Sequence, residues 1–382
     1  MKRLGFILQK SLSLLNSHLT AYIAKATYHH PDGFTFINPC TDKTYIGFWP
    51  DDCLYPYLAQ PEIFNPDNGA KLLAFLTNSI VDLPYVPDRV EPDGSAVMSP
   101  GPKGAPHTDR MPHHLPAAWT RVLGYFKQWG VAIPQKENWA RVIARSFEQV
   151  PFENGLVYND PQNPNVGYGF HDTVAITGME LMSSIVLCRG LERAAELFAD
   201  TADTATVQKW RAQAQAIRDN LCRLYHENIG GYVAGSVDCR QFSVWGNGLA
   251  YWLSSLSQRK AIAATWLKHA DAIFRYGFTR QIPEANGWQR MLMPGYAPGQ
   301  YMNGGYWPVG TAYVIGALAE HHADFAARLA EELAENVARF DCAEWVSPDG
   351  TECGARGFIG SLALPVIALR AAIDGVPLAN VF

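Results

Sequence analysis

The sequence predicts an all-α fold, an (α/α)6 toroid of about six helical hairpins, and two observations lead to this prediction. Segments that are apolar nearly all round alternate with segments that carry one polar face. The connections are unequal, and several of the long ones stand directly before an apolar segment. Two concentric rings, with the apolar helices inside and the amphipathic helices outside, satisfy both observations.

The size and composition favour one large core. The chain has 382 residues, of which 48% are hydrophobic and 18% are charged. A repeated hairpin can place that many residues around one core, so we expect a single domain over 1–382. The net charge of -5 and the lack of a Lys/Arg run argue against nucleic acid as a partner.

The cysteines and the amino terminus bear on the compartment. The seven cysteines are scattered and form no CxxC pair, which argues against a disulfide framework and a zinc site. We therefore expect no metal and no other cofactor, and a reducing, cytoplasmic compartment. Polar residues interrupt 1–24, so that segment is interpreted as the first helix, and no segment is apolar enough to predict a membrane partner. A homo-oligomer is compatible with the sequence.

The helices are most distinct in the second half of the chain. The predicted inner helices are 173–188, 242–254, 307–320 and 357–373. The predicted outer helices between them are 207–225, 259–274 and 323–340, the last with an apolar stripe opposite a row of charges. Weaker helical periodicity marks 4–28, 66–82, 115–129 and 137–149. Together these segments predict about eleven or twelve helices.

The long connections are predicted to form the functional face. They are 29–65, 83–114, 150–171, 226–241 and 275–306, all rich in Gly, Pro, Asn, Asp and aromatic residues. Loops of this length in a compact domain usually carry function. They should gather at the amino ends of the inner helices, where free N–H groups and helix dipoles also point.

Five junctions between a loop and a helix share a mixture of aromatic, carboxylate and amide residues. They read YIGFWPDDCLYPYLA, NVGYGFHDTVAITG, CRQFSVWGNGLAYWL, GQYMNGGYWPVGTAYVIGALA and EWVSPDGTECGARGFIGSLALPV. Sugars bind to such mixtures, because their apolar faces stack on aromatic rings while their hydroxyls need fixed polar partners. A single Trp is more often core packing than a ligand contact, but five similar junctions favour a carbohydrate site.

At these junctions the chain resembles the six-hairpin glycosidase superfamily, especially trehalases and processing or debranching α-glucosidases. GFWPDD is similar to the segment that holds the terminal sugar in those enzymes, and GYGFHDTVAITG is similar to their acid segment. EWVSPDGTECGARGFIGS is similar to their base segment, and NGGYWP is similar to a pocket-wall motif. The resemblance covers roughly residues 45–373 in organisation. It implies a glycosidase that acts on small glycosides or oligosaccharides from their ends.

The resemblance also implies roles for particular residues. Asp172 would be the general acid and Glu344 the general base, which activates water in an inverting reaction with the carboxyl groups roughly 6.5–9.5 Å apart. Asp51 or Asp52, with Trp49, would hold the terminal sugar. The other residues expected to contact substrate are Tyr168, His171, Gln241, Trp245, Asn303, Tyr306 and Trp307.

Several alternatives remain open at this point. Asp172 is also well placed to cap a helix that starts at Thr173. Glu352 is the rival of Glu344 within the same loop, and Glu153 and Glu284 are weaker candidates.

Three other functions also remain open. A sugar epimerase or isomerase would use His171 and a second histidine, and a catalytically silent protein would only bind the sugar. An unsaturated-uronide hydrolase would need an arginine in the pocket, and the candidates are Arg110, Arg280, Arg290 and Arg356.

Overall fold

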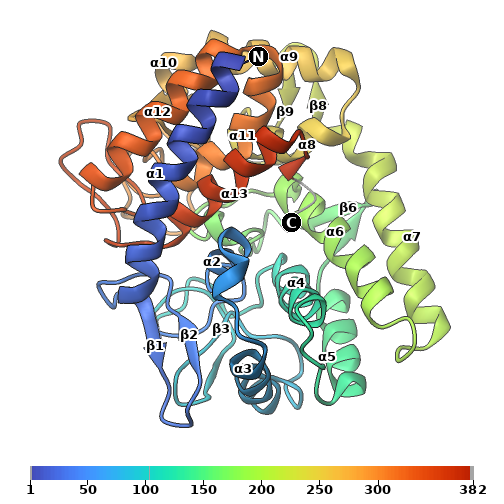
Figure 1. Ribbon diagram of the computed structural model, residues 1–382. Helices are drawn as coiled ribbons and strands as arrows, with labels where there is room; N and C mark the ends of the chain where they lie inside the picture. The colour runs from blue at the N-terminus through green and yellow to red at the C-terminus, as the bar shows by residue number, and fades with distance from the viewer. Residues whose placement is uncertain (1, 103, 379–382) are drawn as a thin grey trace.

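Six helices form the inner ring of the computed structural model, which describes residues 2–102 and 104–378 (Figure 1). They are α2 (Tyr55–Ala59), α4 (Leu115–Gln128), α6 (Leu181–Leu197), α8 (Val244–Ala250), α11 (Pro308–His321) and α13 (Gly360–Asp374). Helix α13 contacts α2 and α11, α11 contacts α8, and α6 contacts both α8 and α4. These helices are apolar nearly all round because other helices enclose them; in α11, every residue from Pro308 to Ile315 is buried.

Six helices with one polar face form the outer ring. They are α1 (Lys2–Ala26), α3 (Pro66–Ile80), α5 (Lys136–Glu148), α7 (Thr204–Asn220), α9 (Leu256–Lys268) and α12 (Ala323–Arg339). In α12, Leu329, Leu333 and Val337 are buried while Arg328 and Glu335 are exposed. The alternation of outer and inner helices confirms the predicted all-α toroid of hairpins. Over the described residues, no helix has the length and hydropathy needed to cross a membrane.

The predicted helix over 173–188 is wrong at its start. Helix α6 begins at Leu181 after its N-cap residue Glu180, and residues 173–180 are not helical. The helix is interrupted at Gly178, whose φ of +76° is outside the helical range. A Cβ at this position would lie 2.3 Å from the Oγ of Ser236, so only glycine fits there. An apolar run alone does not distinguish an extended buried segment from a helix.

Other boundaries differ by less. Helix α2 was not predicted, because five residues are too few to show a helical period. The predicted segment 259–274 divides into α9 and the short α10 (Ala270–Ile273). The predicted segments 207–225 and 242–254 end in the 3-10 turns η3 (Leu221–Leu224) and η4 (Tyr251–Leu253).

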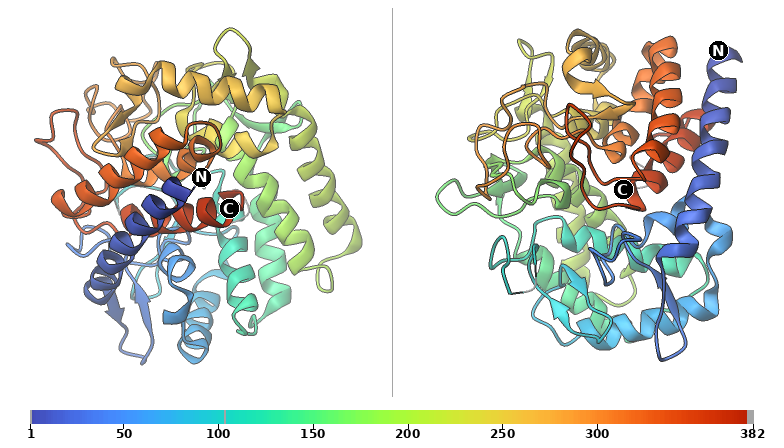
Figure 2. Two further views of the ribbon diagram at one scale, coloured as in Figure 1. Left: turned by 45° about the horizontal axis from the view of Figure 1, so that its top comes forward. Right: turned by 90° about the vertical axis from the view of Figure 1, so that its left-hand side faces the viewer.

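The long loops contain short antiparallel strands, which an all-α expectation did not include. The strand pairs are β1 (Thr27–His29) with β2 (Thr35–Ile37), β3 (Arg89–Val90) with β4 (Ala96–Val97), β8 (Tyr225–His226) with β9 (Gly231–Tyr232), and β10 (Phe274–Arg275) with β11 (Phe278–Thr279). Strands β5 (Phe152–Glu153), β6 (Leu156–Asn159) and β7 (Gly178–Met179) form one sheet. The right-hand view of Figure 2 shows the loops gathered on one side of the helices, as expected.

The two ends of the toroid meet. Figure 1 shows α1 lying along α12 and α13, and the contacts between these helices agree. The backbone N–H of Ile359 donates a hydrogen bond to the carbonyl oxygen of Pro39 at 2.7 Å, and the N–H of Thr41 donates to the carbonyl of Gly357 at 3.1 Å. The first long loop is thus joined directly to the loop that leads into α13.

Candidate active site

One cavity of about 720 Å³ opens on the loop side of the toroid. Its carboxyl and imidazole groups come from the loops that lead into inner helices. Asp51 and Asp52 precede α2, His114 precedes α4, Asp172 precedes α6 and Glu344 precedes α13. The volume is within the range of roughly 300–1,000 Å³ that is usual for small-molecule sites. The loops that lead into four of the inner helices therefore form a site of the size of a small ligand.

Glu344 is held by a tight loop. Its backbone N–H donates to the carbonyl of Ala355 at 2.9 Å, and the backbone N–H of Gly354 donates to the carbonyl of Trp345. Gly354 is required here because a Cβ at that position would lie 2.4 Å from the Trp345 ring and 2.8 Å from Oε2 of Glu344. The hydroxyl of Tyr45 lies 3.2 and 3.3 Å from the two carboxylate oxygens and donates to them. These contacts fix the carboxyl group on the cavity wall.

The environment of Glu344 favours its protonated form in the empty site. Burial and, to a lesser extent, the charge of Asp172 raise the pKa of this carboxyl to about 8, although the hydrogen bond from Tyr45 acts to lower it. The residue is only 5% exposed. Glu344 therefore exchanges its proton near neutral pH rather than in the acid range of an ordinary glutamate.

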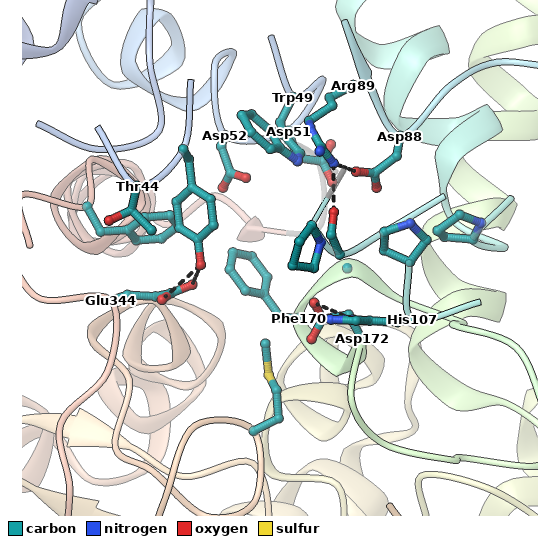
Figure 3. Close-up of a pocket in the computed structure, with 18 of the residues that line it drawn as sticks. Thr44, Trp49, Asp51, Asp52, Asp88, Arg89, His107, Phe170, Asp172 and Glu344 are labelled. Atoms are coloured by element: carbon teal, nitrogen blue, oxygen red, sulfur yellow. Dashed lines mark hydrogen bonds and ion pairs between the residues drawn. The ribbon is translucent and has the colours of Figure 1, made fainter. Parts of the chain in front are cut away.

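Asp172 lies across the cavity from Glu344 (Figure 3). It ends the 3-10 turn η2 (Gly169–His171), in which the N–H of His171 donates to the carbonyl of Tyr168 at 2.7 Å. Nδ1 of His107 lies 3.5 Å from Oδ2 of Asp172. Burial lowers the pKa of His107, but contact with the Asp172 carboxyl outweighs burial and leaves this pKa raised. The His107 ring thus lies within ion-pair distance of the Asp172 carboxyl.

The inner end of the cavity rests on a buried ion pair. Asp51 is bonded to the guanidinium of Arg121, which extends from α4 beneath the cavity. Nε2 of His114 lies 3.8 Å from the other oxygen of Asp51. Burial lowers the pKa of His114 to about 4, so this imidazole is neutral at physiological pH. Tyr168 and Phe358, both buried, also line the cavity.

A second group of charges lies beside Trp49 (Figure 3). Arg89 donates to Asp88 at 3.2 Å and to Glu91 at 2.9 Å, and its guanidinium lies 4.9 Å from the centroid of the Trp49 ring. Burial and, to a lesser extent, the charges of Asp51 and Asp88 raise the pKa of Asp52 to about 8. Burial, together with the two acidic groups beside Asp52, therefore keeps its carboxyl protonated near neutral pH.

Several buried polar atoms of the cavity wall have no hydrogen-bond partner within the described part of the chain. They are Oδ1 of Asp52, Nδ1 of His114 and Oδ1 of Asp172. A buried polar atom without a partner costs free energy, so a bound ligand with hydroxyl groups would gain by satisfying these atoms. The aromatic rings of Trp49, Tyr168 and Phe170 lie in the same wall.

The structure brings half of the predicted site residues together. Trp49, Asp51, Asp52, Tyr168, Asp172 and Glu344 line the cavity. The residues that do not line it are His171, Gln241, Trp245, Asn303, Tyr306 and Trp307. All six of these are buried, so their aromatic and amide groups do not reach the ligand space.

The residues outside the cavity support the loops that form it. Trp245 and Trp307 are fully buried and donate to Thr279 and to the carbonyl of Tyr301. Asn303 accepts from the N–H of Trp288 and donates to the carbonyl of Tyr296, each at 2.8 Å.

Gln241, Tyr306 and His171 have comparable supporting contacts. Gln241 donates to the carbonyl of Gly287 at 3.0 Å, and Tyr306 donates to that of Ala272 at 3.0 Å. The His171 ring stacks against Trp245, with the ring centroids 6.5 Å apart. The mixture of residues at these junctions therefore also serves packing.

The structure bears on the alternatives for the two carboxyl groups. Asp172 does not cap a helix that starts at Thr173, because that helix starts at Leu181. Glu352 is exposed near the turn of its loop, where its carboxylate accepts from Gln300 at 2.8 Å, and it does not line the cavity. Glu153 and Glu284 do not line it either.

Sequence reasoning did not select several residues that line the cavity. They are Tyr45, Asp88, Arg89, His107, His114 and Tyr301. Tyr45 is the first residue of the segment YIGFWPDDCLYPYLA, so its position in this segment could have identified it as a site residue. His107 and Arg89 come from the loop between α3 and α4, where no period or motif marks single residues.

A family model matches part of the chain. Residues 181–360 match the model described as "Mannosylglycerate hydrolase MGH1-like glycoside hydrolase domain". The matched segment contains Glu344 and three of the inner helices, α6, α8 and α11. No curated protein matches the chain at a significant level of sequence similarity.

Solved structures have the same fold. The GH63 mannosylglycerate hydrolase from Thermus thermophilus in complex with glucose matches with a TM-score of 0.59 and 14% identity, over 92% of this chain and 99% of that one. The rhamnosidase from Klebsiella oxytoca with rhamnose bound matches with a TM-score of 0.60 and 15% identity, over 96% and 64%. A bacterial glucoamylase complexed with acarbose matches with a TM-score of 0.59 and 14% identity, over 87% and 50%. At this identity the likeness concerns the fold.

Proposed function

We propose that this chain, a glycoside hydrolase of the six-hairpin superfamily with an MGH1-like domain over residues 181–360, removes a terminal neutral sugar from small glycosides with inversion of the anomeric centre. The observation that carries the proposal is the pair Asp172 and Glu344 on opposite sides of one cavity (Figure 3). An inverting hydrolysis requires an acid on one side of the anomeric carbon and a base on the other.

In the proposed reaction Asp172 is the general acid. It gives its proton to the glycosidic oxygen as the bond to the anomeric carbon breaks. The carboxylate that remains lies 3.5 Å from Nδ1 of His107, and contact with this carboxyl group raises the pKa of His107. His107 thus stabilises the Asp172 carboxylate that is left after the proton has been transferred.

Glu344 is the general base of the same reaction. Its carboxylate takes a proton from water as the water oxygen attacks the anomeric carbon from the opposite face. The hydroxyl of Tyr45 donates to both oxygens and so favours the ionised form that the base requires.

The buried end of the cavity supports the binding of one terminal sugar. Its unpaired atoms on Asp52 and His114 can receive or donate hydrogen bonds to hydroxyl groups, and the ring of Trp49 offers an apolar face. The side chains that carry these atoms are buried or nearly so, which supports a site for a terminal sugar. Glucose is a ligand of the Thermus relative and is a reasonable first probe.

The charges in the cavity favour a neutral sugar over a uronic acid. Arg89 is the only arginine among the lining residues of the described chain, and Asp88 and Glu91 already oppose its charge. Arg110, Arg280, Arg290 and Arg356 do not line the cavity. His171, which an epimerase would need, does not line it either.

The proposal is tested by following the products of hydrolysis directly. The purified protein is incubated with nitrophenyl glycosides and small natural glycosides of glucose, mannose and rhamnose, and the released sugar is followed by proton NMR. Inversion predicts that the first sugar released has the opposite anomeric configuration to the substrate. Release with retained configuration would contradict the inverting mechanism, and the absence of any hydrolysis would contradict the whole proposal.

The pH dependence tests which carboxyl group is the base. Because a base must be ionised and the Glu344 pKa is about 8, kcat/KM should rise with pH up to about 8. Tyr45→Phe removes the hydrogen bond that lowers the pKa of Glu344. In this variant the rise of kcat/KM should therefore occur at higher pH. A kcat/KM that instead falls as pH increases through 8 would exchange the roles of Glu344 and Asp172. The measurement is the initial rate at low substrate concentration across this pH range.

A further inference from the structure

Glu180 carries a buried carboxyl group next to the loop that ends in Asp172. We call residues 166–172 the acid loop. Glu180 is only 2% exposed, and it does not line the main cavity. It is the N-cap residue of α6, yet its side chain makes no capping hydrogen bond to that helix. Burial of a carboxyl group costs free energy unless the group is hydrogen-bonded, so helix capping does not account for this residue.

The Glu180 carboxyl group joins segments on both sides of the acid loop. Nδ1 of His113 lies 3.1 Å from its Oε2, and the side-chain amide of Asn159 donates to its Oε1 at 3.0 Å. The same amide donates to the carbonyls of Asn165 and Ile176, each at 2.7 Å. Asn165 directly precedes the acid loop and Ile176 follows it. Glu180 is therefore part of a hydrogen-bonded group that holds the loop at both of its ends.

The acid loop also packs directly on the Glu180 carboxyl group. A Cβ on Gly167 would lie 2.3 Å from Oε1 and 2.4 Å from Oε2 of Glu180, so only a glycine allows this approach. At the other end of the loop, His171 lines one small internal cavity together with Glu180. The residue after His171 is Asp172. A shift of the Glu180 side chain would therefore move the loop that carries the acid.

The acid loop is bonded to the segment that carries His114 as well. The backbone N–H groups of His113 and His114 donate to the carbonyls of Val166 and Gly167, each at 3.0 Å. His113 thus contacts the acid loop through its backbone and Glu180 through its ring. A buried network in which every member is bonded fixes the relative position of its segments.

We propose that Glu180 is a positioning residue for Asp172: its hydrogen bonds hold the acid loop where Asp172 reaches the glycosidic oxygen. This inference rests on the proposed glycosidase function. Glu180 does not touch the substrate, so it acts only through Asp172. A displacement of about 1 Å at a reacting group can lower a rate by about 10²-fold. The loss should fall on the step that needs the acid.

The test is a ratio of two rates on one sugar, chosen among glucose, mannose and rhamnose as the one released fastest. It is kcat/KM for the dinitrophenyl glycoside divided by kcat/KM for the methyl glycoside. Only the methyl glycoside needs an acid, whereas a smaller folded fraction lowers both rates equally. Glu180→Ala should raise the ratio at least about tenfold over wild type. An unchanged ratio would overturn the inference.

Glu180→Gln is the conservative variant. Its amide oxygen can accept from Asn159 and its amide nitrogen can donate to Nδ1 of His113, so both hydrogen bonds are kept. We expect its ratio to stay within about threefold of wild type. A ratio as high as that of Glu180→Ala would overturn the assignment of positioning to these hydrogen bonds.

Gly167→Ala tests the same contact from the side of the loop. The added methyl group would overlap the Glu180 carboxyl group, so the loop has to move and the ratio should rise at least about fivefold. Gly231→Ala is the matched control. Gly231 is buried and does not line the cavity, and its Cβ would lie 2.4 Å from the Phe242 ring and 2.7 Å from Oδ1 of Asn247. An unchanged ratio in Gly167→Ala, or an equal rise in Gly231→Ala, would overturn the inference.

A double variant separates this inference from the proposed function. If Glu180 acts only through Asp172, Asp172→Asn combined with Glu180→Ala should have the same ratio as Asp172→Asn alone, within about twofold. A further rise of about tenfold in the double variant would show an independent role and overturn the inference. If Asp172→Asn itself leaves the ratio unchanged, or if no glycoside is cleaved, the proposed function fails instead.

Discussion

Glu344→Gln and Asp172→Asn should each lower kcat by about 10²–10⁴-fold on a glycoside with a poor leaving group, because each removes one proton transfer. The two losses differ on an activated substrate. A dinitrophenyl group departs without protonation, so Asp172→Asn should retain most of its activity on a dinitrophenyl glycoside. Glu344→Gln should remain impaired on it, since water must still be deprotonated. Steady-state kinetics on both substrates separate the acid from the base.

Glu352→Gln is the matched control for this comparison. Glu352 occupies the same loop as Glu344 but is exposed and bonded to Gln300. We expect its kcat to stay within about twofold of wild type, since exposed positions away from a site have small effects. A large loss in Glu352→Gln together with an active Glu344→Gln would refute the assignment of the base.

Asp51→Ala should lower the free energy of unfolding by about 3–5 kcal/mol, the usual cost of removing one partner of a buried ion pair. The substitution leaves the guanidinium of Arg121, which is 2% exposed, without the carboxylate that it contacts. The measurement is urea denaturation followed by circular dichroism. A loss below about 1 kcal/mol would show that the buried charge finds compensation elsewhere.

Two further variants interpret that result. Asp200→Ala removes an exposed ion pair with Lys136 and should leave the denaturation midpoint unchanged. Combining Asp51→Leu with Arg121→Met removes both charges and should recover much of the lost stability, because no uncompensated ion stays buried. A double variant as unstable as Asp51→Ala would point to lost packing rather than lost charge.

The architecture was predictable because it depends on a pattern that extends over many residues. The inner helix α11 and the outer helix α12 differ so clearly in polarity that their order along the chain indicates two rings. The start of α6 was not predictable from the same signal, because the residues before it are as apolar as a buried helix. Only the backbone conformation of Gly178 explains why the helix starts later.

The site was predictable only where short motifs mark it. GFWPDD and the segments around Asp172 and Glu344 led to residues that line the cavity. Trp245 and Trp307 occur in similar motifs, but the sequence does not show which face of a junction is turned to the cavity. His107 and Arg89 were missed for a different reason, since they reach the site through the fold of a loop that has no repeat.

The contact between the first long loop and the loop that leads into α13 has a consequence for how the protein becomes active. Tyr45 and Glu344 are 299 positions apart, yet they contact each other where Pro39 pairs with Ile359. The proposed base therefore gains its hydrogen-bond donor only when the final hairpin has docked on the first. During synthesis on a ribosome, a chain whose early helices have already folded would still lack Glu344 and the loop that holds it. Enzymatic activity would therefore appear only when the ring of helices is complete.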